Sequence, residues 1–143
     1  MLTVSVEEML AASADTLWDC IGGFNTLADW HPGIEKSIVA VDRGQTVRTL
    51  TLANGATITE RLEQASDIDR SYTYTLIESP LPIINHHSTL TVSDAGAGRC
   101  IVSWSAAFEM DQGAAANDRS RAEATVSDLY QAGFVALRER FAA

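Results

Sequence analysis

The residues of this chain best suited to chemistry include a carboxylate on a predicted strand. Glu60 shares strand parity with the apolar residues Ile58 and Leu62, so the alternation predicts that its carboxyl group faces the interior. Burial raises the pKa of a carboxyl group, which would suit Glu60 to an acid–base role. An unpaired buried charge is costly, so a cross-strand ion pair with Arg48 is the competing interpretation. The two are compatible, because such a pair can also orient a ligand.

The second candidate is His86, which follows Asn85 on another predicted strand. An imidazole near physiological pH can donate or accept a hydrogen bond, or transfer a proton. Because strand neighbours alternate between faces, His87 is expected to point the opposite way. The competing interpretation is a histidine that is hydrogen-bonded within the core and has no function of its own.

Other kinds of reactive site are not indicated. The histidines have no close spacing, Cys20 and Cys100 form no CxxC motif, and there is no GxSxG nucleophile elbow. We therefore expect no metal ion and no cofactor. His31 lies in Trp30-His31-Pro32, where proline ends a helix, and we interpret this trio mainly as a structural turn.

The composition narrows the class of partner. The formal net charge is -9, and an acidic surface without a basic cluster disfavours both nucleic acid and an anionic membrane. No segment reaches the roughly twenty apolar residues of a membrane span, and the first residues do not resemble an export signal. We expect a cytoplasmic protein with reduced thiols, not inserted in a membrane, that is a monomer or a homodimer.

The elements that must position these residues follow from hydrophobic periodicity. Strands are predicted at 3–7, 34–41, 46–52, 57–65, 72–77, 85–92 and 100–108, and helices at 12–23, 24–30 and 114–141. Short strands separated by turn signals suggest an antiparallel meander. No repeat or linker divides the chain, so we expect a single domain over residues 1–143.

The predicted elements suggest a cavity between the sheet and the last helix. A twisted sheet of this size curls, and one helix with a single apolar face cannot fill the concave side. The residues expected to line the cavity are Arg48, Leu50, Leu52, Ile58, Glu60, Tyr74, His86, Phe108, Tyr130 and Phe134. Trp18 and Trp104 are expected to belong to the core instead.

Several segments in this order resemble the START-like, or Bet v 1-like, helix-grip superfamily (SRPBCC), and within it the polyketide cyclase/dehydrase-like branch. The matching segments are LWDCIGGF at 17–24, LADWHP at 27–32, VRTLTL at 47–52, ITERL at 58–62, SPLPI at 79–83, NH at 85–86, STL at 88–90, and VSWS at 102–105 with Phe108. The resemblance covers nearly the whole chain. It implies an α+β fold in which a seven-stranded curved antiparallel sheet wraps around a long C-terminal helix, with two short helices after the first strand.

Plant abscisic-acid receptors share several of these segments. In them a carboxylate at the position of Glu60 faces the cavity, and a ligand-contacting tyrosine stands at the position of His86. Their gating loop is shortened to Asn54-Gly55 here, and their cavity lysine has no clear equivalent. Hormone reception by that mechanism is therefore not expected.

Three functions remain open at this point. The first is binding of a small hydrophobic or aromatic ligand, as a carrier or sensor, in the cavity between sheet and helix. The second is a polyketide cyclase/dehydratase-like enzyme that uses Glu60 and His86 as acid and base groups, each typically worth about 10²–10⁴-fold in rate. The third is an interaction domain of the chaperone-cofactor type, in which the cavity has no ligand.

Overall fold

The chain forms a seven-stranded sheet with a long C-terminal helix, as seen in a computed structural model that describes residues 1–141. Residues 142–143, at the end of the predicted domain, lie outside the described residues. In chain order the elements are β1 (Leu2–Leu10), α1 (Ala14–Ile21), α2 (Leu27–Trp30), β2 (Ile34–Asp42), β3 (Gln45–Leu52), β4 (Thr57–Ser66), β5 (Ser71–Glu78), β6 (Ile83–Gly96), β7 (Arg99–Met110) and α3 (Asp118–Arg140). The strand order is β1-β7-β6-β5-β4-β3-β2, and all neighbours are antiparallel. The predicted α+β helix-grip fold is confirmed.

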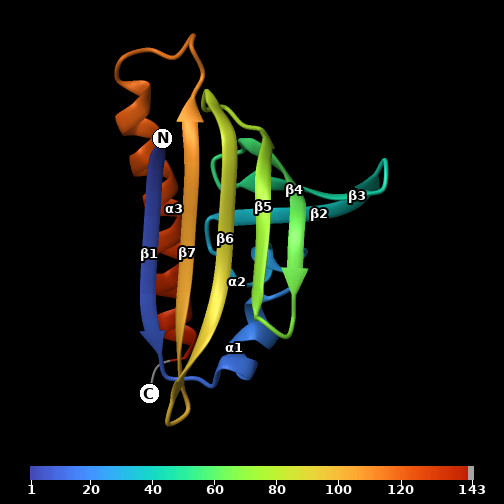
Figure 1. Cartoon of the computed structure of the whole chain (residues 1–143), viewed down its shortest axis with the longest axis vertical. Coiled ribbons are helices and arrows are strands. Elements are labelled where there is room, and N and C mark those ends of the chain that lie inside the picture. The colour runs from blue at the N-terminus through green and yellow to red at the C-terminus, as the bar shows by residue number, and fades with distance from the viewer. Residues whose placement is uncertain (142–143) are drawn as a thin grey trace.

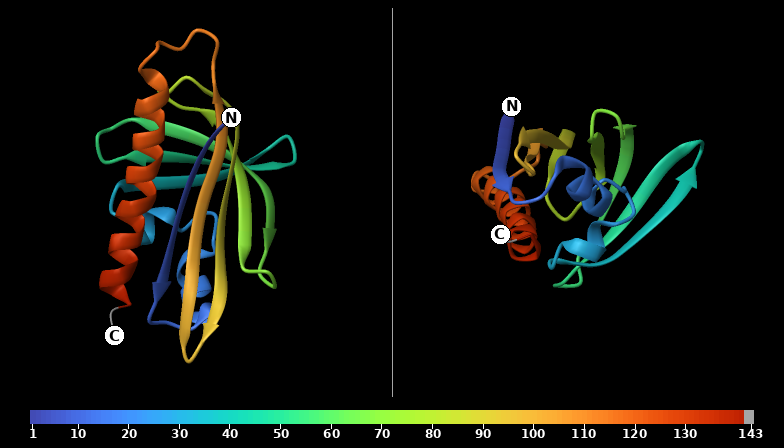
Figure 2. Two further views of the ribbon diagram at one scale, coloured as in Figure 1. Left: turned by 60° about the vertical axis from the view of Figure 1, so that its left-hand side comes forward. Right: turned by 90° about the horizontal axis from the view of Figure 1, so that it is seen from below.

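The sheet is strongly curved, and α3 lies along one side of its inner face. In Figure 1, β1, β7 and β6 run roughly parallel to α3, whereas β2 and β3 run across that direction. Figure 2 shows α3 beside β1, with the β2–β3 hairpin crossing at the far side of the sheet. The inner face is therefore covered by α3 at one side and by α1 and α2 at one end.

The two short helices begin and end where local chemistry allows. The Ser13 side chain accepts a hydrogen bond from the Thr16 backbone N–H at 3.1 Å and so caps α1. The second helix starts at Leu27, not at residue 24 as predicted: Phe24 and Asn25 form a turn closed by the Thr26 N–H, which donates to the Gly23 carbonyl at 3.1 Å. It ends at Trp30, since the next residue precedes Pro32 and adopts extended backbone angles.

The long helix also starts later than predicted, at Asp118 rather than at residue 114. Turns occupy the preceding residues, in which the Ala114 N–H bonds to the Asp111 carbonyl at 2.9 Å. The carboxylate of Asp118 then accepts from the Ala115 N–H at 2.7 Å, which closes the connection before the helix begins.

Aromatic residues fill most of the space under α3. Tyr130 stacks on Trp104 with ring centroids 4.2 Å apart, and Phe134 lies beside the same indole at 6.4 Å. The Trp104 Nε1–H donates to the Tyr74 hydroxyl at 3.0 Å. Trp104 and Trp18 are both buried, which confirms their assignment to the core.

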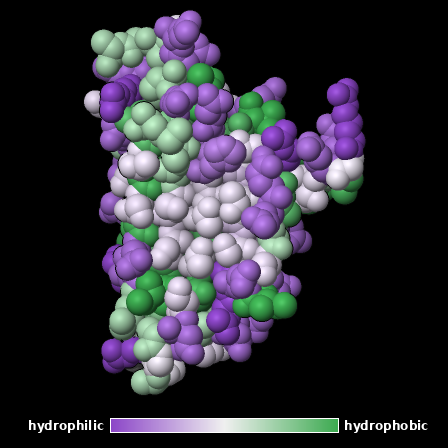
Figure 3. Space-filling view, viewed as in Figure 1, coloured by the Kyte–Doolittle hydropathy of each residue, from purple (hydrophilic) through white to green (hydrophobic). Residues whose placement is uncertain are grey.

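The outer face of the sheet is rich in hydroxyl groups. Cross-strand pairs such as Ser71–Thr91 and Thr73–Thr89 place their side-chain oxygens 3.2 and 3.1 Å apart. Figure 3 shows this face as a broad surface of intermediate hydropathy. A hydroxyl-rich face is suited to contact with solvent, and the candidate reactive residues Glu60 and His86 lie on the other, concave face of the sheet.

Candidate functional site

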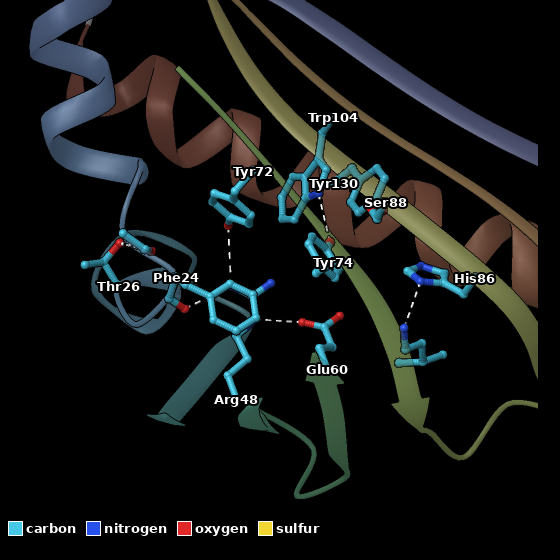
Figure 4. A network of polar contacts seen from close by, with 12 residues as sticks. Phe24, Thr26, Arg48, Glu60, Tyr72, Tyr74, His86, Ser88, Trp104 and Tyr130 are labelled. Atoms are coloured by element: carbon cyan, nitrogen blue, oxygen red, sulfur yellow. Dashed lines mark hydrogen bonds and ion pairs between the residues drawn. The ribbon is translucent and has the colours of Figure 1, made fainter. Parts of the chain in front are cut away.

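A buried ion pair lies on the concave face between β3 and β4. Their register places Arg48 opposite Glu60, and the Arg48 Nε lies 2.8 Å from Glu60 Oε1. The predicted pair is thus confirmed. Arg48 is fully buried, and its Nη1 donates to the Phe24 carbonyl at 3.1 Å and to the Tyr72 hydroxyl at 3.4 Å. Figure 4 shows the guanidinium surrounded by aromatic rings, with those of Phe24 and Tyr74 centred 4.2 and 4.7 Å away.

Burial and ion pairing shift the pKa values of Arg48 and Glu60 in opposite directions. Burial raises the pKa of the Glu60 carboxyl group, and the Arg48 guanidinium opposes that rise. For Arg48, burial alone would lower the pKa, but Glu60 and the neighbouring tyrosines raise it above the ordinary value. Arg48 is therefore a permanent cation, and Glu60 is a stronger base than an exposed carboxylate.

A bulge in β6 turns His86 toward the interior. Ile84 pairs with Glu109 and His87 with Ala107, so two residues of β6 lie opposite one residue of β7. Asn85 within the bulge has φ 52°, a left-handed angle that asparagine tolerates better than most residues. The bulge changes the strand parity at this point, and His86 is buried while His87 is exposed, as their predicted opposite orientation requires.

The ring of His86 is held through one nitrogen. Regular pairing between β5 and β6 ends at Tyr74–Ser88, and beyond it the Leu76 N–H donates to His86 Nδ1 at 3.1 Å. Because Nδ1 accepts, the neutral ring carries its proton on Nε2. Burial, and secondarily the neighbouring His87, lowers the pKa of His86 to about 4, so the ring is neutral at physiological pH. None of the hydrogen bonds among residues 1–141 involves its Nε2.

Glu60 and His86 meet at a small cavity between the sheet and α3. Its volume is about 60 Å³. Its walls are Ile58, Glu60, Tyr74, Leu76, Ser79, Leu81, Ile83, His86, Thr125, Val126, Leu129 and Tyr130. The segment Ser79–Ile83 separates it from a surface depression of about 550 Å³ that shares Leu76, Ser79, Leu81 and Ile83 as lining. One short loop thus divides the two spaces.

Half of the residues expected to line the cavity do line it, namely Ile58, Glu60, Tyr74, His86 and Tyr130. The other half, Arg48, Leu50, Leu52, Phe108 and Phe134, are not among the residues that line this cavity. Arg48 lies behind Glu60, Leu52 packs against the core, and the remaining three are buried within it. Phe108 and Phe134 pack against other aromatic rings, Phe108 beside His86 with centroids 6.3 Å apart and Phe134 beside Trp104 at 6.4 Å.

The sequence interpretation missed seven lining residues: Leu76, Ser79, Leu81, Ile83, Thr125, Val126 and Leu129. Val126 and Leu129 belong to the apolar side of α3, so a helical periodicity signal was present. Ile83 and His86 line the same cavity although they are three positions apart on one strand, and strict alternation would place them on opposite faces. Only the bulge at Asn85 makes this possible.

A second buried histidine, His31, joins the chain after α2 to the middle of α3. Its Nδ1 accepts from the Gly33 N–H at 2.9 Å, and its Nε2 lies 2.6 Å from the Leu129 carbonyl, to which it donates. Burial lowers the pKa of His31, although the bond to Leu129 opposes the shift. Gly133 on α3 packs so closely that an added Cβ would lie 2.8 Å from His31 Cδ2. Both ring nitrogens are thus satisfied within a tightly packed region, as expected for a histidine of the turn after α2.

No three His, Cys, Asp or Glu side chains within residues 1–141 cluster closely enough to hold a metal ion. None of the helices in the described part of the chain has the length and apolarity to cross a membrane.

Comparison with known proteins gives one family and several structures. The family described as polyketide cyclase / dehydrase and lipid transport matches residues 1–142. The protein XoxI from Bacillus cereus is 33% identical, with a TM-score of 0.87 over 99% of this chain and 96% of that one. An uncharacterized protein from Bacillus thuringiensis is 32% identical, with a TM-score of 0.86 over 99% and 100%. The ZhuI aromatase/cyclase from a Streptomyces species shares the fold at 20% identity and a TM-score of 0.75, over 99% and 96% of the two chains. No curated protein matches the chain significantly.

Proposed function

The chain belongs to the polyketide cyclase/dehydrase and lipid transport family, and we propose that it binds a small aromatic or otherwise apolar molecule between the sheet and α3. The predicted family resemblance is thereby confirmed. The family includes both carriers and enzymes in its description, so the residues of this chain must decide between the two.

The observation that carries the proposal is a pair of polar groups in an apolar cavity, each of which can still form a hydrogen bond. The Glu60 carboxylate can accept a hydrogen bond at Oε2, and the neutral His86 ring presents its Nε2–H. The surrounding walls are mostly aliphatic and aromatic, and buried polar groups are normally satisfied. A ligand that brings a hydroxyl to Glu60 and an oxygen acceptor to His86 would satisfy both.

The size of the cavity constrains how such a ligand enters. A volume of 60 Å³ is well below the roughly 300–1,000 Å³ of ordinary ligand sites. The depression of 550 Å³ lies on the other side of the Ser79–Ile83 segment. Movement of that segment would join the two spaces, so we propose that this chain binds its ligand with Ser79–Ile83 displaced.

Native mass spectrometry followed by a thermal-shift screen tests the proposal. The screen uses hydroxylated naphthalenes, hydroxybenzaldehydes and medium-chain fatty acids as probes. A ligand at a hundredfold excess over its dissociation constant stabilises the fold by about 2.7 kcal/mol. We expect stabilising compounds to lose their effect in His86→Phe and to keep it in His87→Phe, the neighbour on the opposite face.

Two outcomes would count against binding at this cavity. A stabilising compound that acts equally on His86→Phe and on the unchanged protein binds elsewhere. No co-purified molecule and no shift across the screen would favour an interaction domain of the chaperone-cofactor type.

A second candidate function is acid–base catalysis on a carbonyl compound, favoured by the direction of the two pKa shifts. Burial raises the pKa of Glu60, which strengthens it as a base, and keeps His86 neutral, which leaves Nε2–H free to donate to a carbonyl oxygen. Together they suit removal of a proton next to a carbonyl group. This is the first step of an aldol-type cyclisation.

Deuterium exchange at the central carbon of benzoylacetone separates catalysis from binding. We expect the protein to accelerate the exchange, and Glu60→Gln to reduce that acceleration by about 10²-fold while the compound still binds. Exchange at the uncatalysed rate with the compound bound would leave binding as the function.

A further inference from the structure

The strand β2 is an open edge of the sheet with apolar residues on both faces. It is the last strand in the order, and within residues 1–141 only β3 pairs with it. Ile38, Val39 and Val41 are 52%, 36% and 74% exposed. Figure 3 shows the β2–β3 hairpin projecting from the body, with apolar surface behind a hydrophilic tip. By contrast, α3 covers the opposite edge strand, β1, where Arg138 Nη1 lies 2.6 Å from Glu8 Oε1.

The middle of this edge, residues 37–41, lacks the features that usually prevent strand pairing; these lie only at its ends, as a bulge at Glu35 and the charged residues Lys36 and Asp42. Natural edge strands carry charges, proline or bulges that block addition of another strand. The segment 37–41 reads Ser-Ile-Val-Ala-Val, and its pairing with β3 is regular from Lys36 to Asp42. The central part of β2 is therefore free to accept a strand.

The hairpin turn defines which backbone groups face outward. Arg43 and Gly44 have φ values of 53° and 79°, the two positive angles of a type I′ turn. In such a hairpin Asp42 and Gln45 form the closing hydrogen-bonded pair, and bonding alternates along the strand. The N–H and C=O groups of Ser37, Val39 and Val41 thus point to the open edge.

An antiparallel second copy fits this edge in one register. When Val39 pairs with Val39 of a second copy, Ser37 lies opposite Val41, so all three outward-facing residues meet as hydrogen-bonded pairs. The same register places Lys36 of each copy opposite Asp42 of the other, an attractive cross-strand pair formed twice. If the pairing is centred on Ala40 instead, Ile38 lies opposite Asp42, and the attractive Lys36–Asp42 pairs are lost.

We propose that β2 pairs with β2 of a second copy of this chain in the register centred on Val39. The two seven-stranded sheets then join into one continuous sheet, in which Val39 meets Val39 at the two-fold axis and Ile38 of each copy lies opposite Ala40 of the other. An edge-to-edge contact is smaller than a standard interface of about 1,600 Å², so the dissociation constant should be on the order of tens to hundreds of micromolar. This inference is independent of the proposed ligand.

Sedimentation velocity of the full chain from 10 μM to about 1 mM tests the dimer, and charge exchange tests its register. Lys36→Glu and Asp42→Lys each place like charges opposite each other twice, and each should weaken the dimer by about tenfold. An equimolar mixture of the two variants forms two attractive pairs and should dimerise as the unchanged protein does. Net charge alone cannot mimic this, because it would weaken the dimer in Lys36→Glu and strengthen it in Asp42→Lys.

Amide hydrogen exchange gives a second, local measurement. The N–H groups of Ser37, Val39 and Val41 should exchange quickly at 10 μM and be protected near 1 mM, while those of Ile38 and Ala40 are protected at both. A monomer throughout the concentration range overturns the proposal. So does a dimer that both single variants leave unchanged, or protection that never reaches Ser37, Val39 and Val41.

Discussion

The two buried histidines, His31 and His86, differ in whether their Nε2 atom has a hydrogen-bond partner. Both His31 and His86 accept a backbone N–H at Nδ1, and burial lowers the pKa of both. His31 then donates to the Leu129 carbonyl, whereas His86 Nε2 has no hydrogen-bond partner within residues 1–141 and lines a cavity. Burial and a shifted pKa alone therefore do not distinguish a structural histidine from a candidate site; the remaining hydrogen-bond capacity does.

The surroundings of the two rings follow the same division. His31 lies against the rings of Trp30 and Trp104, with centroids 5.8 and 6.2 Å away, and Gly133 allows α3 to approach it closely. His86 also has two rings beside it, those of Tyr74 and Phe108 with centroids 5.9 and 6.3 Å away, but it lies where β5 and β6 cease to pair and borders the cavity beside the loop Ser79–Ile83. One region is packed to its limit, and the other retains space.

Replacement of each histidine by alanine gives the largest expected contrast. His31→Ala removes two hydrogen bonds and leaves a void in a packed region, so the free energy of unfolding should fall by about 4 kcal/mol. His86→Ala removes one backbone hydrogen bond next to an existing cavity, and the loss should be about 2 kcal/mol. Urea unfolding followed by tryptophan fluorescence measures both, with the exposed His87→Ala as a control expected to change little. Equal losses of unfolding free energy at His31 and His86 would show that the unpaired Nε2 of His86 does not make its contribution to stability smaller than that of His31.

The pH dependence of stability gives the next contrast. The folded pKa of His86 is about 4, against roughly 6.5 in an unfolded chain, so between these values the unfolded state binds more protons. Stability from this group is therefore complete above pH 6.5 and is lost as the pH falls toward 4, by about 3 kcal/mol in total. In His86→Phe the free energy of unfolding, measured by urea unfolding at a series of pH values, should depend less steeply on pH between about 4 and 6.5, because the contribution of the histidine is removed. If the free energy of unfolding has the same pH dependence in both proteins, His86 takes up a proton in the folded state as readily as in the unfolded chain, and its pKa is not lowered.

The sequence was informative where strand alternation holds and uninformative where it breaks. Parity alone placed Arg48 opposite Glu60 and separated His86 from His87, because regular strands preserve it. Parity does not tell whether an inward residue borders empty space: Phe108 and Phe134 point inward, but they lie in the core and not at the cavity.

Two features of the site depend on interactions that are distant in sequence. The stacking of Tyr130 on Trp104 reduces the open space, and no local pattern announces it. The bulge at Asn85 reverses the strand parity and brings Ile83 to the cavity. An Asn at a positive φ is a weak signal in sequence, since asparagine is also common in turns and caps.

Addition of a single carbon to α3 should distinguish the two regions with the smallest perturbation. Gly133→Ala would ordinarily stabilise a helix interior by up to about 1 kcal/mol, since glycine is a poor helix former. Here the new Cβ would lie 2.8 Å from His31 Cδ2 and 3.0 Å from Trp30 Cζ3, and we expect a net loss of about 1 kcal/mol. Val126→Ile adds the same one carbon two turns earlier, where the 60 Å³ cavity can receive it, so stability should change by less than about 0.5 kcal/mol. Thermal unfolding of the two variants side by side measures this difference. If Gly133→Ala raises stability, the region around His31 can yield, and if Val126→Ile is the more damaging change, the space beside His86 is not available to a ligand.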